Sequence, residues 1–169
     1  MTDLPALVEA LRSRGLTIAV AESLTGGQVV AALVDVPGAS AVLHGGIVAY
    51  ATPLKRDLVG VDARLLAEHG AVHPEVARQL ADRVRSALAV DGRAARVGIG
   101  TTGVAGPDPQ DGVAAGTAFV AVAVDEAILV REVHEEGARD AVRAAATRAA
   151  LALLAATLEV PPLSLGLPE

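Results

Sequence analysis

The sequence contains one lysine and one tyrosine, and both lie in the segment IVAYATPLKRDLVG, residues 47–60. Every other basic residue is an arginine. A lysine amine can lose its proton near neutral pH when it is desolvated, whereas a guanidinium group stays charged. Lys55 is therefore a candidate general base, with Tyr50 as a candidate proton relay or orienting group. The alternative is a solvated lysine on a short helix and a tyrosine packed in a strand.

A candidate nucleophile, Ser23, lies in the segment AVAESLTGGQVV, where we expect a buried strand to end and a helix to begin. Ligand sites of α/β proteins lie at the carboxyl edge of the sheet. Free N–H groups at the start of this helix would point towards Ser23 and could stabilise a phosphate or an oxyanion. The alternative is that Ser23 and Thr25 only cap the helix. The segment does not match the nucleophile elbow G-x-S-x-G.

A glycine-rich segment, GIGTTGVAGPDPQDG at residues 98–112, follows another predicted strand. Gly103 and Gly106 carry no side chain, so the backbone after Thr102 could approach a ligand closely. The spacing fits neither the phosphate loop G-x-x-x-x-G-K-[ST] nor the dinucleotide motif G-x-G-x-x-G. The segment therefore predicts a binding loop at the sheet edge or simply a connection.

Two arginines, Arg139 and Arg143, lie four residues apart and so on one face of the expected final helix. Positive charges at a helix N-terminus oppose the helix dipole, and an anion must compensate them unless they are solvated. A bound phosphate would do so. The alternative is ion pairing with Glu135, Glu136 or Asp140.

The histidines give little support for a metal site or a histidine base. They lie in turns or at the ends of predicted elements, and Gly70 interrupts any helix that would carry both His69 and His73. There is also no cysteine to supply a thiolate ligand. We therefore expect no metal and no cofactor.

Segments with helical and strand periodicity alternate along the chain, which predicts an α/β layered fold. We expect a single-domain, three-layer α/β/α sandwich with a mixed sheet, formed by residues 1–160 and followed by a proline-rich tail at 161–169. A turn at Asp125-Glu126 predicts a hairpin. The helices are expected over residues 4–14, 26–36, 53–60, 62–70, 73–92 and 139–158, and the strands over 16–22, 45–51, 95–102, 116–124 and 127–135.

Composition narrows the class of protein. The 169 residues carry a net charge of −6, whereas a nucleic-acid surface normally needs a basic stripe. The N-terminus does not resemble a signal sequence, and no apolar run is long enough to span a membrane. We expect a cytoplasmic protein with a small-molecule substrate, no nucleic-acid or membrane partner, and a homodimer formed through Ala-rich helix surfaces.

Four segments in this order and spacing resemble the CinA C-terminal domain family: AESLTGG, GGIVAYATPLKRDLVGV, HGAVHPEVARQLA and TTGVAGPDPQDGVAAGT. The resemblance runs from about residue 4 to residue 158. Stand-alone members include PncC-type nicotinamide-nucleotide amidases, which deamidate nicotinamide mononucleotide to nicotinate mononucleotide and ammonia without a metal. The chain is similar to this stand-alone form, because the additional N-terminal domain of CinA proteins is not evident.

The resemblance implies a catalytic set in which Ser23 is the nucleophile, Lys55 the base and Tyr50 an assisting hydroxyl. It also implies a substrate-binding set, made of the turn residues Thr25, Gly26 and Gly27, the loop residues Thr102, Gly103 and Gly106, and a phosphate-side residue, Arg139, with Arg143 as a weaker candidate.

The sequence departs from the family pattern at several positions. Leu24 replaces a frequent cysteine, His73 stands where serine is common, and Ala138 replaces the aspartate before Arg139. The loop PDPQDG also differs from the usual glycine-rich version. Two alternatives to the amidase stay open: a non-catalytic nucleotide-binding or regulatory module using the same pocket, and a hydrolase of the same mechanism acting on another amide.

Overall fold

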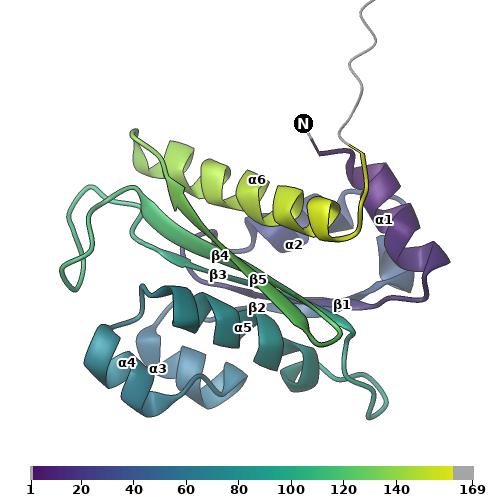
Figure 1. Cartoon of the computed structure of the whole chain (residues 1–169), viewed down its shortest axis with the longest axis horizontal. Coiled ribbons are helices and arrows are strands. Elements are labelled where there is room, and N and C mark those ends of the chain that lie inside the picture. The colour runs from purple at the N-terminus through teal and green to yellow at the C-terminus, as the bar shows by residue number, and fades with distance from the viewer. Residues whose placement is uncertain (1, 162–169) are drawn as a thin grey trace, which may run out of the picture.

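The computed structural model describes residues 2–161, which form a five-stranded sheet covered by helices on both faces (Figure 1). This confirms the predicted α/β fold with three layers. One helical layer contains α1, α2 and α6, and the other contains α3, α4 and α5. The helices are α1 (Leu4–Ser13), α2 (Gln28–Val34), α3 (Thr52–Leu54), α4 (Ala63–His69), α5 (Pro74–Ala87) and α6 (Arg139–Thr157), with a 3₁₀ turn η1 (Ala39–Ala41) and a short π-helix η2 (Lys55–Val59).

The sheet is mixed, as predicted, with the strand order β2-β1-β3-β4-β5. Its strands are β1 (Ile18–Glu22), β2 (Leu43–Val48), β3 (Val97–Gly103), β4 (Thr117–Val124) and β5 (Ala127–His134). β1 runs parallel to β2 and to β3, whereas β4 runs antiparallel to β3 and to β5. Because three neighbouring strands are parallel, the segments that follow Glu22, Val48 and Gly103 leave the sheet at the same edge.

The helix α5 packs directly on the central strand β3. A Cβ atom at Gly98 or at Gly100 would overlap the backbone of Ala81 or of Ala77, so glycine is needed at both strand positions. On the opposite face, the buried aliphatic side chains of β1, β3 and β4 pack against α1, α2 and α6 in the largest core cluster. The sheet is therefore fixed between two aliphatic layers, as expected for a chain with almost no aromatic residues.

Every predicted helix and strand is present, with changes at the boundaries. The predicted helix 73–92 ends at Ala87, because Val90 and Arg93 exchange backbone hydrogen bonds in a tight turn. The predicted helix 53–60 divides at Lys55 into α3 and a π-helix that the pattern did not predict. β2 ends at Val48, so Tyr50 lies beyond the strand that was expected to contain it. The predicted tail, apart from residue 161, lies outside the described residues.

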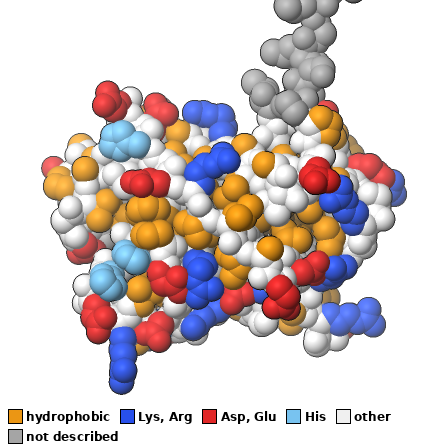
Figure 2. Space-filling model, in the orientation of Figure 1, with side chains coloured by type: hydrophobic (Ala, Val, Ile, Leu, Met, Phe, Trp, Pro, Cys, Tyr) orange, Lys and Arg blue, Asp and Glu red, His pale blue; other side chains and the backbone are white. Residues whose placement is uncertain are grey.

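Charges of both signs are interspersed on the face of the molecule that carries β5 (Figure 2). Leu129 and Val130 of β5 are among the exposed apolar side chains. None of the helices within residues 2–161 is both long enough and apolar enough to span a membrane.

Candidate active site

A cavity of about 300 Å³ opens at the edge where β1 and β3 end. Its walls come from the turn after β1, the segment from the end of β2 into η2, the loop after β3 and the start of α6. The residues predicted from the sequence that line it are Ser23, Tyr50, Lys55, Thr102, Gly103, Gly106 and Arg139. The fold therefore brings Ser23 and Lys55 into the lining of one cavity, although 32 residues separate them in the chain.

The side chain of Lys55 is buried, with 1% of the residue exposed. Its Nζ atom donates hydrogen bonds to the carbonyl oxygens of Ala49 at 2.9 Å and of Tyr50 at 3.0 Å. No acidic side chain within the described residues forms an ion pair with it. Burial lowers the pKa of Lys55 to about 8, because desolvation penalises the charged amine. Lys55 is thus not a solvated lysine, and a neutral fraction is available near neutral pH.

The segment that provides these two carbonyl acceptors is attached to the end of β1. The Ala49 N–H donates to the Glu22 carbonyl oxygen at 2.8 Å, directly before Ser23. The π-helix then turns the chain so that the Val61 N–H donates to the Lys55 carbonyl oxygen at 3.0 Å. Single-turn π-helices occur frequently at functional sites.

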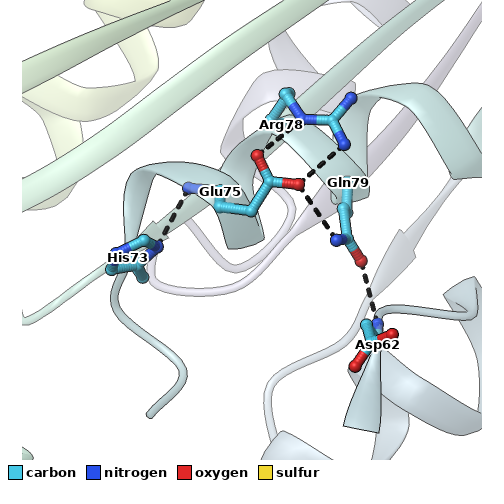
Figure 3. A network of polar contacts seen from close by, with 5 residues as sticks. All are labelled: Asp62, His73, Glu75, Arg78 and Gln79. Atoms are coloured by element: carbon cyan, nitrogen blue, oxygen red, sulfur yellow. Dashed lines mark hydrogen bonds and ion pairs between the residues drawn. The ribbon is translucent and has the colours of Figure 1, made fainter. Parts of the chain in front are cut away.

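A polar network on α5 holds the chain that leaves this π-helix (Figure 3). The Asp62 N–H donates to Gln79 at 2.9 Å, and the Gln79 amide donates to Glu75 at 3.0 Å. Arg78 makes two further hydrogen bonds to Glu75 and holds the pKa of that carboxyl below its usual range. His73 caps α5, accepting the Glu75 N–H at its ring nitrogen at 3.2 Å. Histidine at this position therefore fills the capping role that serine would have.

Ser23 is held through its backbone. Its N–H donates to Thr101 Oγ1 at 3.3 Å, and the same hydroxyl lies 2.8 Å from Thr25 Oγ1. The Ser23 hydroxyl makes no hydrogen bond to another described residue. It is not among fully buried polar atoms without a partner, so it is accessible from the cavity. Neither Ser23 nor Thr25 caps α2 through its side chain, because the N-cap residue is Gly27. The cap-only interpretation is therefore wrong, and Thr101 is a contact that the sequence analysis missed.

Glu22, a buried residue that the sequence analysis treated only as part of a strand, occupies the start of α2. Its carboxylate is 0% exposed and accepts N–H groups from Gly27 at 2.9 Å, Val29 at 3.2 Å and Val30 at 2.9 Å. The Gly26 N–H donates to the Ser23 carbonyl oxygen at 3.1 Å. The expectation of free amides is therefore wrong from Gly26 onwards, because the Glu22 carboxylate or backbone carbonyl oxygens already accept these N–H groups.

The three turn residues Thr25, Gly26 and Gly27 are not part of the cavity lining. Their contact with substrate stays a prediction. Within the turn, the backbone N–H groups of Leu24 and Thr25 have no hydrogen-bond acceptor among the described residues, and Leu24 lines the cavity.

Tyr50 and Arg139 meet at the cavity mouth. Tyr50 is 57% exposed, and its hydroxyl accepts a hydrogen bond from Arg139 Nη2 at 2.6 Å. Arg139 Nη1 donates to the Gly106 carbonyl oxygen at 2.8 Å, so this arginine links the loop after β3 to the segment after β2. Tyr50 contacts Lys55 through its backbone carbonyl, whereas its hydroxyl is directed to Arg139.

Arg143, one turn further along α6, contacts the nucleophile turn. Its Nε donates to the Leu24 carbonyl oxygen at 2.9 Å, and its Nη2 donates to the Thr25 carbonyl oxygen at 3.0 Å. Within residues 2–161, neither Arg139 nor Arg143 forms an ion pair with a carboxylate. The ion pairing weighed as the alternative, with Glu135, Glu136 or Asp140, is therefore not present in the described structure.

Two further contacts involve polar residues near the cavity. Thr102 donates its hydroxyl hydrogen to the Ala71 carbonyl oxygen at 2.6 Å. The His69 and His73 rings stack with centroids 4.7 Å apart. Among the described residues, no group of three or more histidine, aspartate or glutamate side chains is placed to hold a metal ion.

Comparison with known proteins identifies the family to which this geometry belongs. Residues 4–158 match the model of the CinA C-terminal domain. The chain belongs to the CinA C-terminal domain family. A CinA-like protein of Frankia casuarinae is 45% identical over 144 residues, covering 85% of this chain and 32% of that protein. A putative competence-damage inducible protein of Geobacillus kaustophilus is 43% identical over 137 residues, covering 80% of this chain and 32% of that protein. The chain thus spans about a third of the length of these curated relatives.

Solved structures of CinA-type proteins have the same fold. A CinA superfamily protein from Klebsiella pneumoniae superposes with a TM-score of 0.84 at 31% identity, covering 93% of this chain and 96% of that chain. A competence/damage inducible protein from Agrobacterium tumefaciens gives a TM-score of 0.81 at 30% identity, covering 94% and 97%. The sequence resemblance to the CinA family is therefore confirmed at the level of fold and family.

Proposed function

We propose that this domain is an amidohydrolase that deamidates nicotinamide mononucleotide to nicotinate mononucleotide and ammonia, as in the PncC-type members of its family. The observation that supports it most is the pairing of a buried amine of lowered pKa, Lys55, with the Ser23 hydroxyl in one cavity. A serine hydroxyl becomes nucleophilic when a neighbouring base accepts its proton. Burial without a carboxylate partner gives Lys55 the neutral form that such a base requires.

The reaction proceeds in two balanced steps. Neutral Lys55 accepts the Ser23 hydroxyl proton as the serine oxygen bonds to the carboxamide carbon, and the carbonyl oxygen takes the negative charge. The proton then passes to the nitrogen, the C–N bond breaks, and ammonia leaves. A water molecule next gives a proton to Lys55 and attacks the acyl-enzyme. The ester bond breaks, Lys55 returns this proton to the Ser23 oxygen, and the nicotinic acid group that is released loses its remaining proton to solvent as the carboxylate.

Arg139 is the group best placed to hold the phosphate of a mononucleotide. It lies at the mouth of the cavity, and its partners there are neutral oxygens of Tyr50 and Gly106. A phosphate dianion would form stronger, charge-assisted hydrogen bonds with this guanidinium. With the phosphate at the mouth, the carboxamide end of the substrate enters the cavity towards Ser23.

The experiment that tests the proposal is ammonia release from nicotinamide mononucleotide by the purified protein, with and without a metal chelator. We expect release that survives the chelator, is lost in Ser23→Ala and is kept in Ser40→Ala, an exposed matched control. Release that stops with the chelator would overturn the metal-independent mechanism. The absence of release by the unaltered protein would overturn the substrate.

The second candidate, a non-catalytic nucleotide-binding module, is favoured by one observation. No hydrogen bond joins Ser23 Oγ to Lys55 Nζ, which instead donates to two backbone carbonyl oxygens. Intact nucleotide recovered after prolonged incubation, together with measurable binding, would support this candidate against the amidase.

The pH dependence of ammonia release is expected to follow the deprotonation of Lys55. Its pKa is lowered from 10.5 to about 8, and only the neutral amine accepts a proton. The rate of ammonia release should therefore rise as the pH increases through about 8 and level off above it. Below the pKa, the rate should change about tenfold per pH unit, because the neutral fraction of Lys55 does so. Initial rates between about pH 6 and 9.5 would check this. A midpoint near the ordinary lysine value, or a flat profile, would contradict the assignment of Lys55 as the base.

A further inference from the structure

Arg143 contacts the turn that carries Ser23 from outside the cavity. The guanidinium donates to two consecutive carbonyl oxygens, those of Leu24 and Thr25. Its Nη2 lies so close to Gly26 that a Cβ atom there would be 3.1 Å away. This cation is therefore packed against the turn itself, not directed into the cavity, and Arg143 is not among the cavity-lining residues.

One of the two peptide groups that Arg143 contacts carries an N–H that is free to serve an oxyanion site. The Leu24 carbonyl and the Thr25 N–H belong to one peptide unit, so a cation on the oxygen makes the N–H a stronger donor. The Leu24 and Thr25 N–H groups have no acceptor among the described residues, although both residues are buried. Leu24 lines the cavity, so these two neighbouring donors are free to bind a ligand oxygen beside Ser23.

The two amides that follow cannot take this role. The Gly26 N–H is bonded to the Ser23 carbonyl oxygen, and the Gly27 N–H to the Glu22 carboxylate. We infer that the oxyanion site consists of the Leu24 and Thr25 N–H groups, and that Arg143 is the positioning residue that fixes the turn carrying them and polarises the Leu24–Thr25 peptide. This inference rests on the proposed acyl transfer at Ser23.

Three variants test the role of Arg143. Arg143→Gln should lower kcat by about 10- to 100-fold with a small change in KM, somewhat less than the loss caused by deleting an oxyanion donor directly. Arg143→Lys should recover part of kcat, because an ammonium can contact one carbonyl but lacks the planar fork. Arg148→Gln changes an exposed arginine of the same helix, without a hydrogen bond to the described residues, and should behave as the unaltered protein.

Substrate choice separates positioning from phosphate binding. The Arg143→Gln loss in kcat should be equal on nicotinamide mononucleotide and on nicotinamide riboside, which has no phosphate. A loss confined to the phosphorylated substrate, seen as a raised KM, would overturn the inference and make Arg143 a phosphate ligand. Thermal unfolding within a few degrees of the unaltered protein would exclude global destabilisation, and Arg143→Lys serves if the glutamine variant does not fold.

A second readout keeps this inference separate from the choice of substrate. A fluorophosphonate reagent forms a covalent bond to an activated serine and places a phosphoryl oxygen in the oxyanion site. We expect labelling at Ser23 that is slowed about tenfold or more in Arg143→Gln. If neither nicotinamide compound is hydrolysed, the proposed function fails, while this labelling still decides the role of Arg143. Equal labelling rates, or no labelling of the unaltered protein, would overturn the inference.

Discussion

Lys55→Arg is expected to lower kcat/KM for ammonia release by about 10³-fold or more, nearly as much as Lys55→Ala. The arginine would keep the positive charge and much of the length of the side chain. It would not supply a base, because guanidinium does not lose its proton in proteins. The lysine pKa near 8 depends on burial of an amine without a carboxylate partner, and no buried arginine can reproduce that neutral form.

The measurement is steady-state ammonia release, with folding checked by thermal unfolding. Lys55→Met provides a neutral, unbranched side chain for the same buried position and should be as inactive as the arginine variant. Arg56→Gln is the matched control, because this neighbouring residue is exposed and pairs only with Asp57 among the described residues. Substantial activity in Lys55→Arg would contradict the base assignment, whatever the activity of the other variants.

The fold was predictable because the hydrophobic residues follow clear helical or strand periodicity in successive segments of the chain. Glycine and proline mark the boundaries of helices: Gly70 ends α4, and Pro74 begins α5. The turn at Asp125-Glu126 was also predicted from local chemistry. The π-helix at Lys55 was not predictable in this way, because it depends on how the chain fits between the end of β1 and α5 rather than on the residues within it.

The candidate site was predicted as a set of residues but not as a set of contacts. The parallel strands carry Ser23 and Thr102 to the same sheet edge, so their proximity follows from topology. The partner of each polar group depends on positions that spacing alone does not give. Arg139 and Arg143 lie one turn apart on the same helix, yet one contacts the Tyr50 hydroxyl and the other two backbone carbonyls.

The nucleophile turn is held from both sides by opposite charges that do not contact each other. Glu22 accepts the N–H groups that follow the turn, and Arg143 donates to the carbonyl oxygens within it. Each charge satisfies backbone groups that would otherwise be buried without partners. Glu22 and Arg143 therefore hold the Ser23 turn through backbone contacts that neither residue type predicts.

Glu22→Gln is accordingly expected to have the largest effect on stability, a loss of about 2–4 kcal/mol in the free energy of unfolding. The carboxylate accepts three N–H groups through two oxygens: Oε2 takes those of Gly27 and Val29, and Oε1 takes that of Val30. A glutamine amide offers one oxygen and one NH₂ group, so at least one buried N–H would face another donor. The charge assistance to the remaining hydrogen bonds is also lost.

Urea unfolding at neutral pH would measure this loss, with Glu9→Gln as the control. Glu9 is an exposed residue of α1 that pairs with Arg12, and its substitution should change the unfolding free energy by less than about 0.5 kcal/mol. Because the turn displaced in Glu22→Gln carries Ser23, kcat should fall as well, even under conditions where the variant is fully folded. An unfolding midpoint and a kcat both equal to those of the unaltered protein would show that the helix start tolerates a neutral acceptor. The internal anion would then not be what holds the nucleophile in place.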